Sequence, residues 1–222
     1  VDFAQVLGEY VDVIVCRAKA HSSVQQLAQH SGCPVVNGLT ELAHPCQALA
    51  DLFTVQEVFG DLPGRKIAYV GDANNVARSL LLACGKLGVR FAIASPAGYD
   101  FDGDYLAQVR TAVPNLDLVQ THDPAEAVRD ASAVYTDVWV SMGQEAEKAA
   151  RAAAFADYQV NEALIRLAPR EALFLHCLPA HRGEEVTDGV IDGPHSAVIR
   201  QAANRMHVQK GLLVWLLADQ AK

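Results

Sequence analysis

The feature that most constrains the fold is a regular alternation of short apolar runs and amphipathic stretches from residue 66 onwards. The apolar runs predict strands at 66–70, 90–94, 117–120, 133–138 and 172–177. The stretches between them predict helices at 75–87, 102–113, 124–129, 145–155 and 161–167. Because parallel strands are joined by crossover helices, this alternation predicts an α/β fold with a doubly wound parallel sheet. A dense turn signal at 60–64 marks a domain boundary before the sheet begins.

The first 59 residues show a different succession of predicted strands and helices. They predict a strand over 11–17, a helix over 21–31, a brief strand over 34–37 and a helix over 45–59, with Pro45 in its first turn. The first of these strands belongs to a sheet without earlier partners, and Val1 is not a natural start, so we expect an N-terminal portion to be absent. At the other end, apolar spacing over 196–218 predicts a long terminal helix.

Charge and cysteine content narrow the class of protein. Among 222 residues, 18 Lys and Arg face 26 Asp and Glu, a net charge of −8, which argues against nucleic acid or an anionic membrane as the main partner. No apolar run approaches the roughly 20 residues of a membrane span, and no targeting peptide is evident, so we expect a cytoplasmic protein. The five cysteines lack CxxC pairing, so neither a disulfide framework nor a structural zinc site is expected.

Polar side chains follow several of the predicted strands. His176 and Cys177 end one strand just before Pro179, and Asp137 lies near the end of another, before a loop that bends at Gly143. In open parallel sheets ligands bind at the carboxyl ends of the strands. A buried cysteine acting as a small hydrophobe is the alternative for Cys177, and an exposed loop without a ligand is the alternative for Asp137.

A dinucleotide site is the main rival for this sheet. The turn at 71–75 has only Gly71 of the three glycines that such a site needs, and the second strand ends in Ala94-Ser95-Pro96 without an acid. The turn offers instead Asn75, whose amide suits a small carboxylate, or which simply caps the helix. An acid, a thiol and an amide together fit an amino-acid ligand.

A second polar pair opens the helix at 45–59. His44 and Gln47 are three residues apart and share a face at the positive end of that helix. This arrangement suits a polar or anionic ligand, although capping of the helix by the same two residues is equally compatible with the pattern.

Four motifs in this order resemble the carbamoyltransferases, and specifically those that use ornithine. They are His44-Pro45-Cys46-Gln47, Gly71-Asp72-Ala73-Asn74-Asn75, Asp137-Val138-Trp139-Val140-Ser141-Met142-Gly143 and His176-Cys177-Leu178-Pro179. The resemblance covers essentially the whole chain. It implies that 1–59 is the tail of a carbamoyl phosphate-binding domain with its linking helix. It further implies that 60–195 is a Rossmann-like, ornithine-binding domain, and that 196–222 is a terminal helix packing back on the first domain.

The resemblance also implies site residues. Arg17, His44 and Gln47 would bind the carbamoyl group, with Arg205 as a further contact to carbamoyl phosphate. The ornithine site would be formed by Asn75, Asp137, Ser141 and Met142, with Cys177 and Leu178 between the two substrates. The family's Ser-Thr-Arg-Thr phosphate loop would precede residue 1.

The implied reaction is attack of the ornithine side-chain amine on carbamoyl phosphate, giving L-citrulline and phosphate in arginine biosynthesis. It requires no metal or organic cofactor. Because an amine of pKa ~10 is protonated at neutral pH, the site must generate its neutral form, and Cys177 poised by Asp137 is the candidate for that proton management. Arg17 and His44 would stabilise the oxyanion. Two arginines are few for a phosphate, which suggests a contribution from the absent segment or from a neighbouring subunit of a homotrimer, the usual family assembly.

Two alternatives remain open at this stage. The first is a carbamoyltransferase with another acceptor, such as putrescine or an acylated ornithine, against which Ser141-Met142-Gly143 argues. The second is a truncated, inactive fragment that binds an amino acid. The charged stretch 181–185 after Pro179 has no assigned role and is expected to be an exposed loop.

Overall fold

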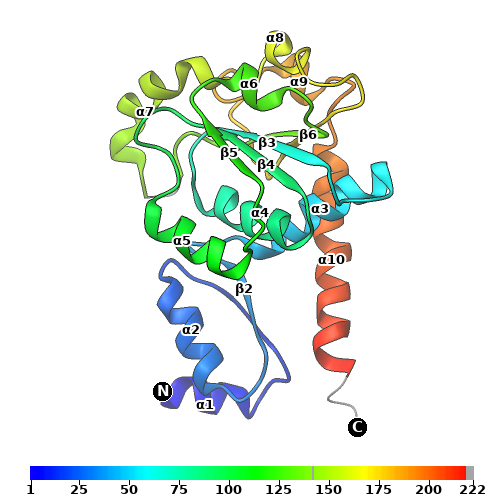
Figure 1. Ribbon diagram of the computed structural model, residues 1–222. Helices are drawn as coiled ribbons and strands as arrows, with labels where there is room; N and C mark the ends of the chain where they lie inside the picture. Colours follow the sequence, from blue (N-terminus) through cyan, green and yellow to red (C-terminus); the bar gives the residue numbers. More distant parts are fainter. Residues whose placement is uncertain (142, 219–222) are drawn as a thin grey trace.

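A computed structural model describes residues 1–141 and 143–218, and its main body is a five-stranded parallel sheet (Figure 1). The strand order is β5-β4-β3-β6-β7. The strands are β3 (Lys66–Val70), β4 (Arg90–Ala94), β5 (Leu118–Thr121), β6 (Ala133–Thr136) and β7 (Leu173–His176). Chain order runs outward from β3 to β5 and then returns to β6 on the other side of β3, so the sheet is doubly wound, as predicted.

Helices cover both faces of this sheet (Figure 1). One face is covered by α3 (Pro45–Phe59), α4 (Asn75–Lys86) and α5 (Gly103–Ala112). The other is covered by α6 (Pro124–Val128), α7 (Lys148–Phe155), α8 (Glu162–Ile165) and α9 (Asp188–Ile191). Alternate residues of each strand enter the two cores, with Tyr69 and Tyr135 on the first face and Ala68 and Val134 on the second. The central strands β3 and β6 are therefore buried along their whole length.

The N-terminal part forms a separate small layer below the sheet (Figure 1). It contains α1 (Asp2–Gly8), β1 (Ile14–Arg17), α2 (His21–His30) and β2 (Val35–Leu39). Strands β1 and β2 pair in parallel, with Ile14 opposite Val35. From β2 the chain turns at residues 40–43 into α3, which carries it to the large sheet.

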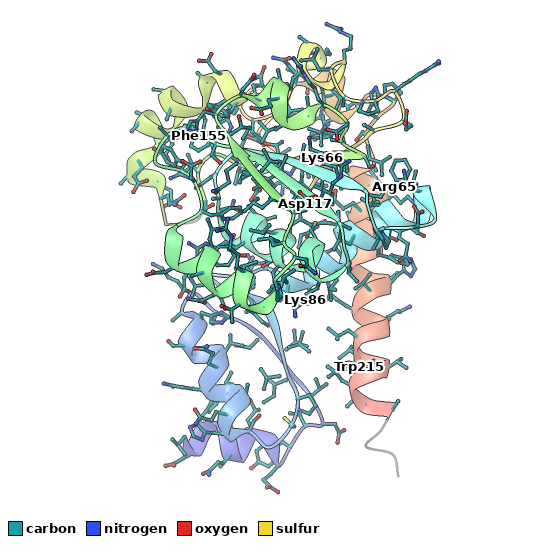
Figure 2. All side chains as sticks on the ribbon, viewed as in Figure 1. Arg65, Lys66, Lys86, Asp117, Phe155 and Trp215 are labelled. Atoms are coloured by element: carbon teal, nitrogen blue, oxygen red, sulfur yellow. The ribbon has the colours of Figure 1, made fainter. Side chains whose placement is uncertain are left out.

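The last helix, α10 (Val198–Ala218), packs along α3 with its first half. Asn204 of α10 donates a hydrogen bond to Thr54 Oγ1 of α3 at 2.9 Å, and both side chains are buried. The second half of α10 extends below the large sheet, to the level of the N-terminal layer in this view, and its Trp215 is 73% exposed (Figure 2). None of the described helices is long and apolar enough to cross a bilayer.

Several elements differ from the sequence prediction. The predicted helix at 145–155 begins as a 3₁₀ turn, η1 (Glu145–Glu147), and a further turn, η2 (Ala156–Tyr158), follows α7. Helices α1 and α9 were not predicted, because seven and four residues are too few to show helical periodicity. The prediction of an exposed loop at 181–185 is wrong for its last residue. Glu185 is fully buried, because its carboxylate faces the buried imidazole of His176.

Candidate active site

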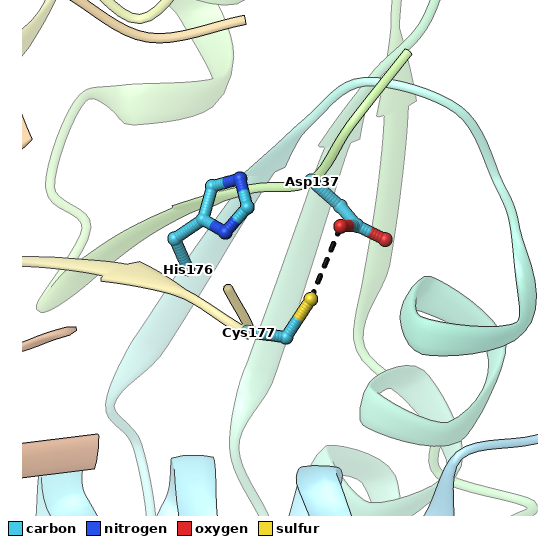
Figure 3. Close-up of side chains that lie close together, drawn as sticks. All are labelled: Asp137, His176 and Cys177. Atoms are coloured by element: carbon cyan, nitrogen blue, oxygen red, sulfur yellow. Dashed lines mark hydrogen bonds between the residues drawn. The ribbon is translucent and has the colours of Figure 1, made fainter. Parts of the chain in front are cut away.

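Asp137 and Cys177 meet at the carboxyl ends of neighbouring strands (Figure 3). Thr136, the last residue of β6, pairs with His176, the last residue of β7, so the residues that follow them are also neighbours. The Cys177 thiol donates a hydrogen bond to Asp137 Oδ1 at an Sγ to oxygen distance of 3.1 Å. Burial, and then the charge of Asp137, raise the pKa of Cys177 well above its usual value. The sulfur is therefore a thiol and a hydrogen-bond donor at neutral pH.

Asn74 holds the other oxygen of the same carboxylate. Its Nδ2 donates to Asp137 Oδ2 at 2.8 Å, while its Oδ1 accepts from the backbone N–H groups of Val76 and Ala77 and so caps α4. Sequence analysis missed Asn74, because two adjacent asparagines at a helix start do not reveal which is the cap. Capping by Asn75 was the alternative left open and is wrong, since Asn75 Nδ2 donates to the carbonyl oxygen of Thr40 at 2.7 Å.

His176 lies beside the Asp137–Cys177 pair, is fully buried, and forms its hydrogen bonds with other groups. Its Nδ1 accepts from Leu178 N–H at 2.9 Å, and its Nε2 lies 3.2 Å from Glu185 Oε1. The proton is therefore on Nε2 and is donated to Glu185. Asp137, His176 and Cys177 could offer three metal-ligand atoms within 4.8 Å of one another, but both imidazole nitrogens are already engaged in these hydrogen bonds. His176 therefore has no ring nitrogen free to bind a metal ion.

A second polar cluster joins the start of α3 to α10. Arg205 Nη1 donates to Gln47 Oε1 at 2.5 Å and lies 3.2 Å from His44 Nε2. His44 makes no side-chain capping bond to α3, so helix capping is not its role. Burial lowers the pKa of His44 to about 4, with further contributions from the charges of Arg205 and Arg17. His44 is thus neutral at pH 7 and can accept the Arg205 N–H at Nε2.

Two buried atoms of this cluster have no hydrogen-bond partner among the described residues, namely His44 Nδ1 and Arg205 Nε. Since His44 Nε2 accepts from Arg205, its Nδ1 carries the proton, and both orphaned atoms are donors. Buried donors without partners are costly in free energy. The cluster is consequently suited to a ligand that brings acceptor oxygens.

The remaining predicted site residues lie around these two groups. Arg17 is exposed at the end of β1, where its charge contributes to the lowered pKa of His44. Ser141 is half-buried, and its N–H donates to Gln144 Oε1 at 3.0 Å. Leu178 is half-buried with a φ of 57° and precedes a cis peptide bond to Pro179. Met142 lies outside the residues that the structure describes.

Hydrogen bonds join α4 to the segment that leads into α3, and so connect the elements that carry the two groups. The backbone N–H of His44 donates to Ser79 Oγ on α4 at 2.7 Å, and Asn75 holds the turn that leads into His44 through Thr40. Arg151, which sequence analysis also missed, is buried and joins Asp72 to the backbone carbonyl of Trp139. It thereby fixes the loops after β3 and β6 relative to each other.

This fold and site define a doubly wound α/β protein with polar side chains at the carboxyl ends of β3, β6 and β7, around the topological switch point, and with a second polar cluster where α3 and α10 meet. The chain belongs to the aspartate/ornithine carbamoyltransferase family. The family's carbamoyl phosphate-binding domain matches residues 1–57, and its aspartate/ornithine-binding domain matches residues 63–216.

Individual relatives agree with this assignment. The ornithine carbamoyltransferase of Anoxybacillus flavithermus is 54% identical over 218 residues, which are 97% of this chain and 69% of the relative. That of Bacillus subtilis is 52% identical over 97% of this chain and 68% of the relative. The solved structure of ornithine carbamoyltransferase from Pyrococcus furiosus superposes with a TM-score of 0.93 at 47% identity, covering 98% of this chain and 70% of that one.

Proposed function

We propose that this protein transfers the carbamoyl group of carbamoyl phosphate to the side-chain amine of L-ornithine, giving L-citrulline and phosphate for arginine biosynthesis. The observation that carries the proposal is a pair of polar groups: the buried donors His44 Nδ1 and Arg205 Nε, which lack a partner among the described residues, and the Asp137–Cys177 pair at the carboxyl ends of β6 and β7. The first group suits the oxygens of carbamoyl phosphate, and the second suits an amine. Membership of the aspartate/ornithine carbamoyltransferase family supports both the carbamoyl phosphate assignment and the amine assignment.

On the carbamoyl phosphate side, the chemistry needs positive charge and fixed donors. We assign Arg17, His44, Gln47 and Arg205 to this substrate. In the transition state the carbonyl oxygen becomes an oxyanion, and preorganised donors such as His44 Nδ1–H and the Arg17 guanidinium stabilise it by about 3 to 4 kcal/mol each. Because His44 is neutral, it donates without placing a second buried cation beside Arg205.

On the ornithine side, we assign Asn75, Asp137, Ser141 and Met142 to binding, with Cys177 and Leu178 between the substrates. The amine nitrogen bonds to the carbonyl carbon, the carbon–oxygen bond to phosphate breaks, and one nitrogen-bound proton leaves with the phosphate. Only the neutral amine can attack. The Asp137 carboxylate, which accepts a hydrogen bond from the Cys177 thiol, is the local group suited to removing the ammonium proton.

We also assign a role to each part of the chain and an oligomeric state to the protein. We assign 1–59 to the carbamoyl phosphate-binding domain and its linking helix, 60–195 to the ornithine-binding domain, and 196–222 to a terminal segment returning to the first domain. A homotrimer in the cytoplasm completes the proposal, on the basis of the family resemblance. Light scattering of the purified protein tests the trimer, and a monomer at micromolar concentration would contradict it.

The first experiment is citrulline formation from carbamoyl phosphate and L-ornithine. It is run on this chain and on a form extended at its N-terminus by the family's phosphate loop, with putrescine and N-acetylornithine as competing acceptors. Turnover that prefers ornithine supports the assignment. A folded extended form that uses only putrescine or N-acetylornithine, or none of the three acceptors, would overturn it.

A further inference from the structure

A buried carboxyl group lies beneath the two substrate groups and belongs to neither. Asp51, in the middle of α3, has no solvent exposure. Its Oδ1 accepts two hydrogen bonds, from Gln47 Nε2 at 2.8 Å and from Gln201 Nε2 of α10 at 2.5 Å. Burying a carboxyl group in a helix–helix contact is costly, so a purely structural contact at this position would be better served by an apolar residue.

These two bonds decide which way both amides point. A glutamine amide has an NH₂ group on one side and an oxygen on the other, and the two are interchangeable in shape. Because Asp51 takes the NH₂ group of each, both oxygens must face outward. Gln47 Oε1 then accepts from Arg205 Nη1, and Gln201 Oε1 accepts from the backbone N–H of His176 at 2.9 Å.

We propose that Asp51 is a positioning residue that orients the amides of Gln47 and Gln201, and through them couples the Arg205 cluster to the His176–Cys177 strand end. The inference rests on the proposed function, because it concerns how the two substrate groups are held in register. One acceptor oxygen thus fixes one hydrogen bond in each group. With an apolar residue at 51 either amide could flip, and its NH₂ group would then face Arg205 or the His176 N–H.

The surroundings of Asp51 allow this role over a wide pH range. The titratable groups that face it are Arg205 on α10, Tyr135 on β6, Cys84 on α4 and Cys177 directly after β7. Burial raises the pKa of Asp51 to about 7, while the amide bonds and Arg205 oppose that rise. The carboxyl group keeps an acceptor oxygen whether or not it is protonated. Asparagine has the same shape and the same acceptor oxygen, and so mimics the protonated form.

Two substitutions at Asp51 therefore distinguish the effect of its acceptor oxygen from the effect of its negative charge. We expect Asp51→Asn to keep kcat/KM for carbamoyl phosphate within about threefold of wild type, since both amides keep their partner. We expect Asp51→Leu to lower it by about 30-fold or more, because the donor of Arg205 and the N–H of His176 each lose a fixed acceptor. Thr54→Val is the matched control, since it removes a buried hydrogen bond between the same two helices that touches neither Gln47 nor His176.

A second variant tests the hydrogen bond from the His176 N–H to Gln201 Oε1, and its result does not depend on whether Asp51→Leu folds. Gln201→Leu keeps the hydrogen bond between Gln47 and Asp51 but leaves the His176 N–H without an acceptor. We expect kcat to fall about tenfold while the KM for carbamoyl phosphate stays within about threefold. A raised KM with unchanged kcat would contradict the proposed coupling.

The outcomes distinguish this inference from the proposed function. Citrulline formation by the wild-type protein, with and without the N-terminal extension, is measured first, and its failure in both forms counts against the function. With an active wild type, three results would overturn the role of Asp51. These are an Asp51→Asn variant that loses as much activity as Asp51→Leu, a folded Asp51→Leu variant with wild-type kcat/KM, and a Thr54→Val control with an equal loss.

Discussion

At the scale of single residues, Cys177 is held by its surroundings as a protonated thiol. Its pKa is raised first by burial and then by the Asp137 charge, to which the S–H group donates. A cysteine nucleophile needs the opposite environment, one that favours the thiolate. The thiol therefore acts by donating a hydrogen bond that orients the Asp137 carboxylate, which we propose meets the ornithine ammonium.

Alkylation rates test this protonation state. We expect iodoacetamide at pH 8 to label Cys177 at least about tenfold more slowly than the half-buried Cys33, because the reactive thiolate is scarce at Cys177. In Asp137→Asn the pKa of Cys177 falls and labelling accelerates, while access to the sulfur stays the same. Peptide mass spectrometry over time measures both rates. Equal labelling of the two cysteines in the wild type would refute the thiol assignment.

Arg17 is a residue for which we expect an effect on turnover without an effect on the stability of the fold. Its side chain is exposed, and among the described residues it forms no hydrogen bond or ion pair. We expect Arg17→Ala to lower kcat by about 100-fold or more, as for a lost oxyanion donor, with an unchanged melting temperature. Citrulline assays and thermal unfolding measure the two effects. Near-normal turnover would remove Arg17 from the mechanism.

At the scale of elements, Arg151 shows how a helix outside the sheet shapes the site. It is buried in α7, forms an ion pair with Asp72 in the turn after β3, and donates to Trp139 O in the loop after β6 at 2.5 Å. The guanidinium also stacks over Tyr99, 4.9 Å from the ring centroid. A single side chain thus connects the loops on both sides of the switch point.

We expect Arg151→Met to destabilise the fold by about 3 kcal/mol, because it leaves the Asp72 carboxylate buried without its cation. Burial already raises the pKa of Asp72, and losing Arg151 raises it further. A raised folded pKa means stability lost as pH rises, so the effect is larger at pH 8 than at pH 5.

Urea unfolding at the two pH values measures this effect, and Arg110→Met, at an exposed arginine of α5, is the control. Asp72→Asn in the Arg151→Met background should recover part of the loss. If Arg151→Met unfolds at the same urea concentration as the control, the ion pair contributes nothing.

The same elements show what could be predicted from the sequence. Strands β3 and β4 were predicted to the residue, because continuous apolar runs between turn residues have few other interpretations. The position of Asp137 and Cys177 at strand ends followed from the same pattern. The burial of Glu185 and of Asp51 could not be predicted, because a charged residue looks solvent-exposed until its partners, distant in sequence, are known. His176 and Gln201 become such partners only in the folded chain.

At the scale of the whole molecule, two buried groups of the site oppose each other in their effect on stability. The pKa of His44 falls from 6.5 to about 4, so the unfolded chain binds more protons between these values and stability rises with pH. The pKa of Asp51 rises from 3.8 to about 7, so the folded chain binds more protons in that window and stability falls as pH rises. Between about pH 4 and 6.5 the two slopes largely cancel.

Removing either group should expose the slope of the other. We expect Asp51→Asn to gain stability steadily from pH 4 to 6.5, because only the His44 slope remains, and His44→Gln to lose stability over the same range. Each change amounts to at most about 3 kcal/mol across the window, from about 1.4 kcal/mol per unit of pKa. Urea unfolding at half-unit pH steps measures the three curves. Wild-type and Asp51→Asn curves that run parallel would show that Asp51 does not titrate there, whereas diverging curves locate its ionisation beneath the site.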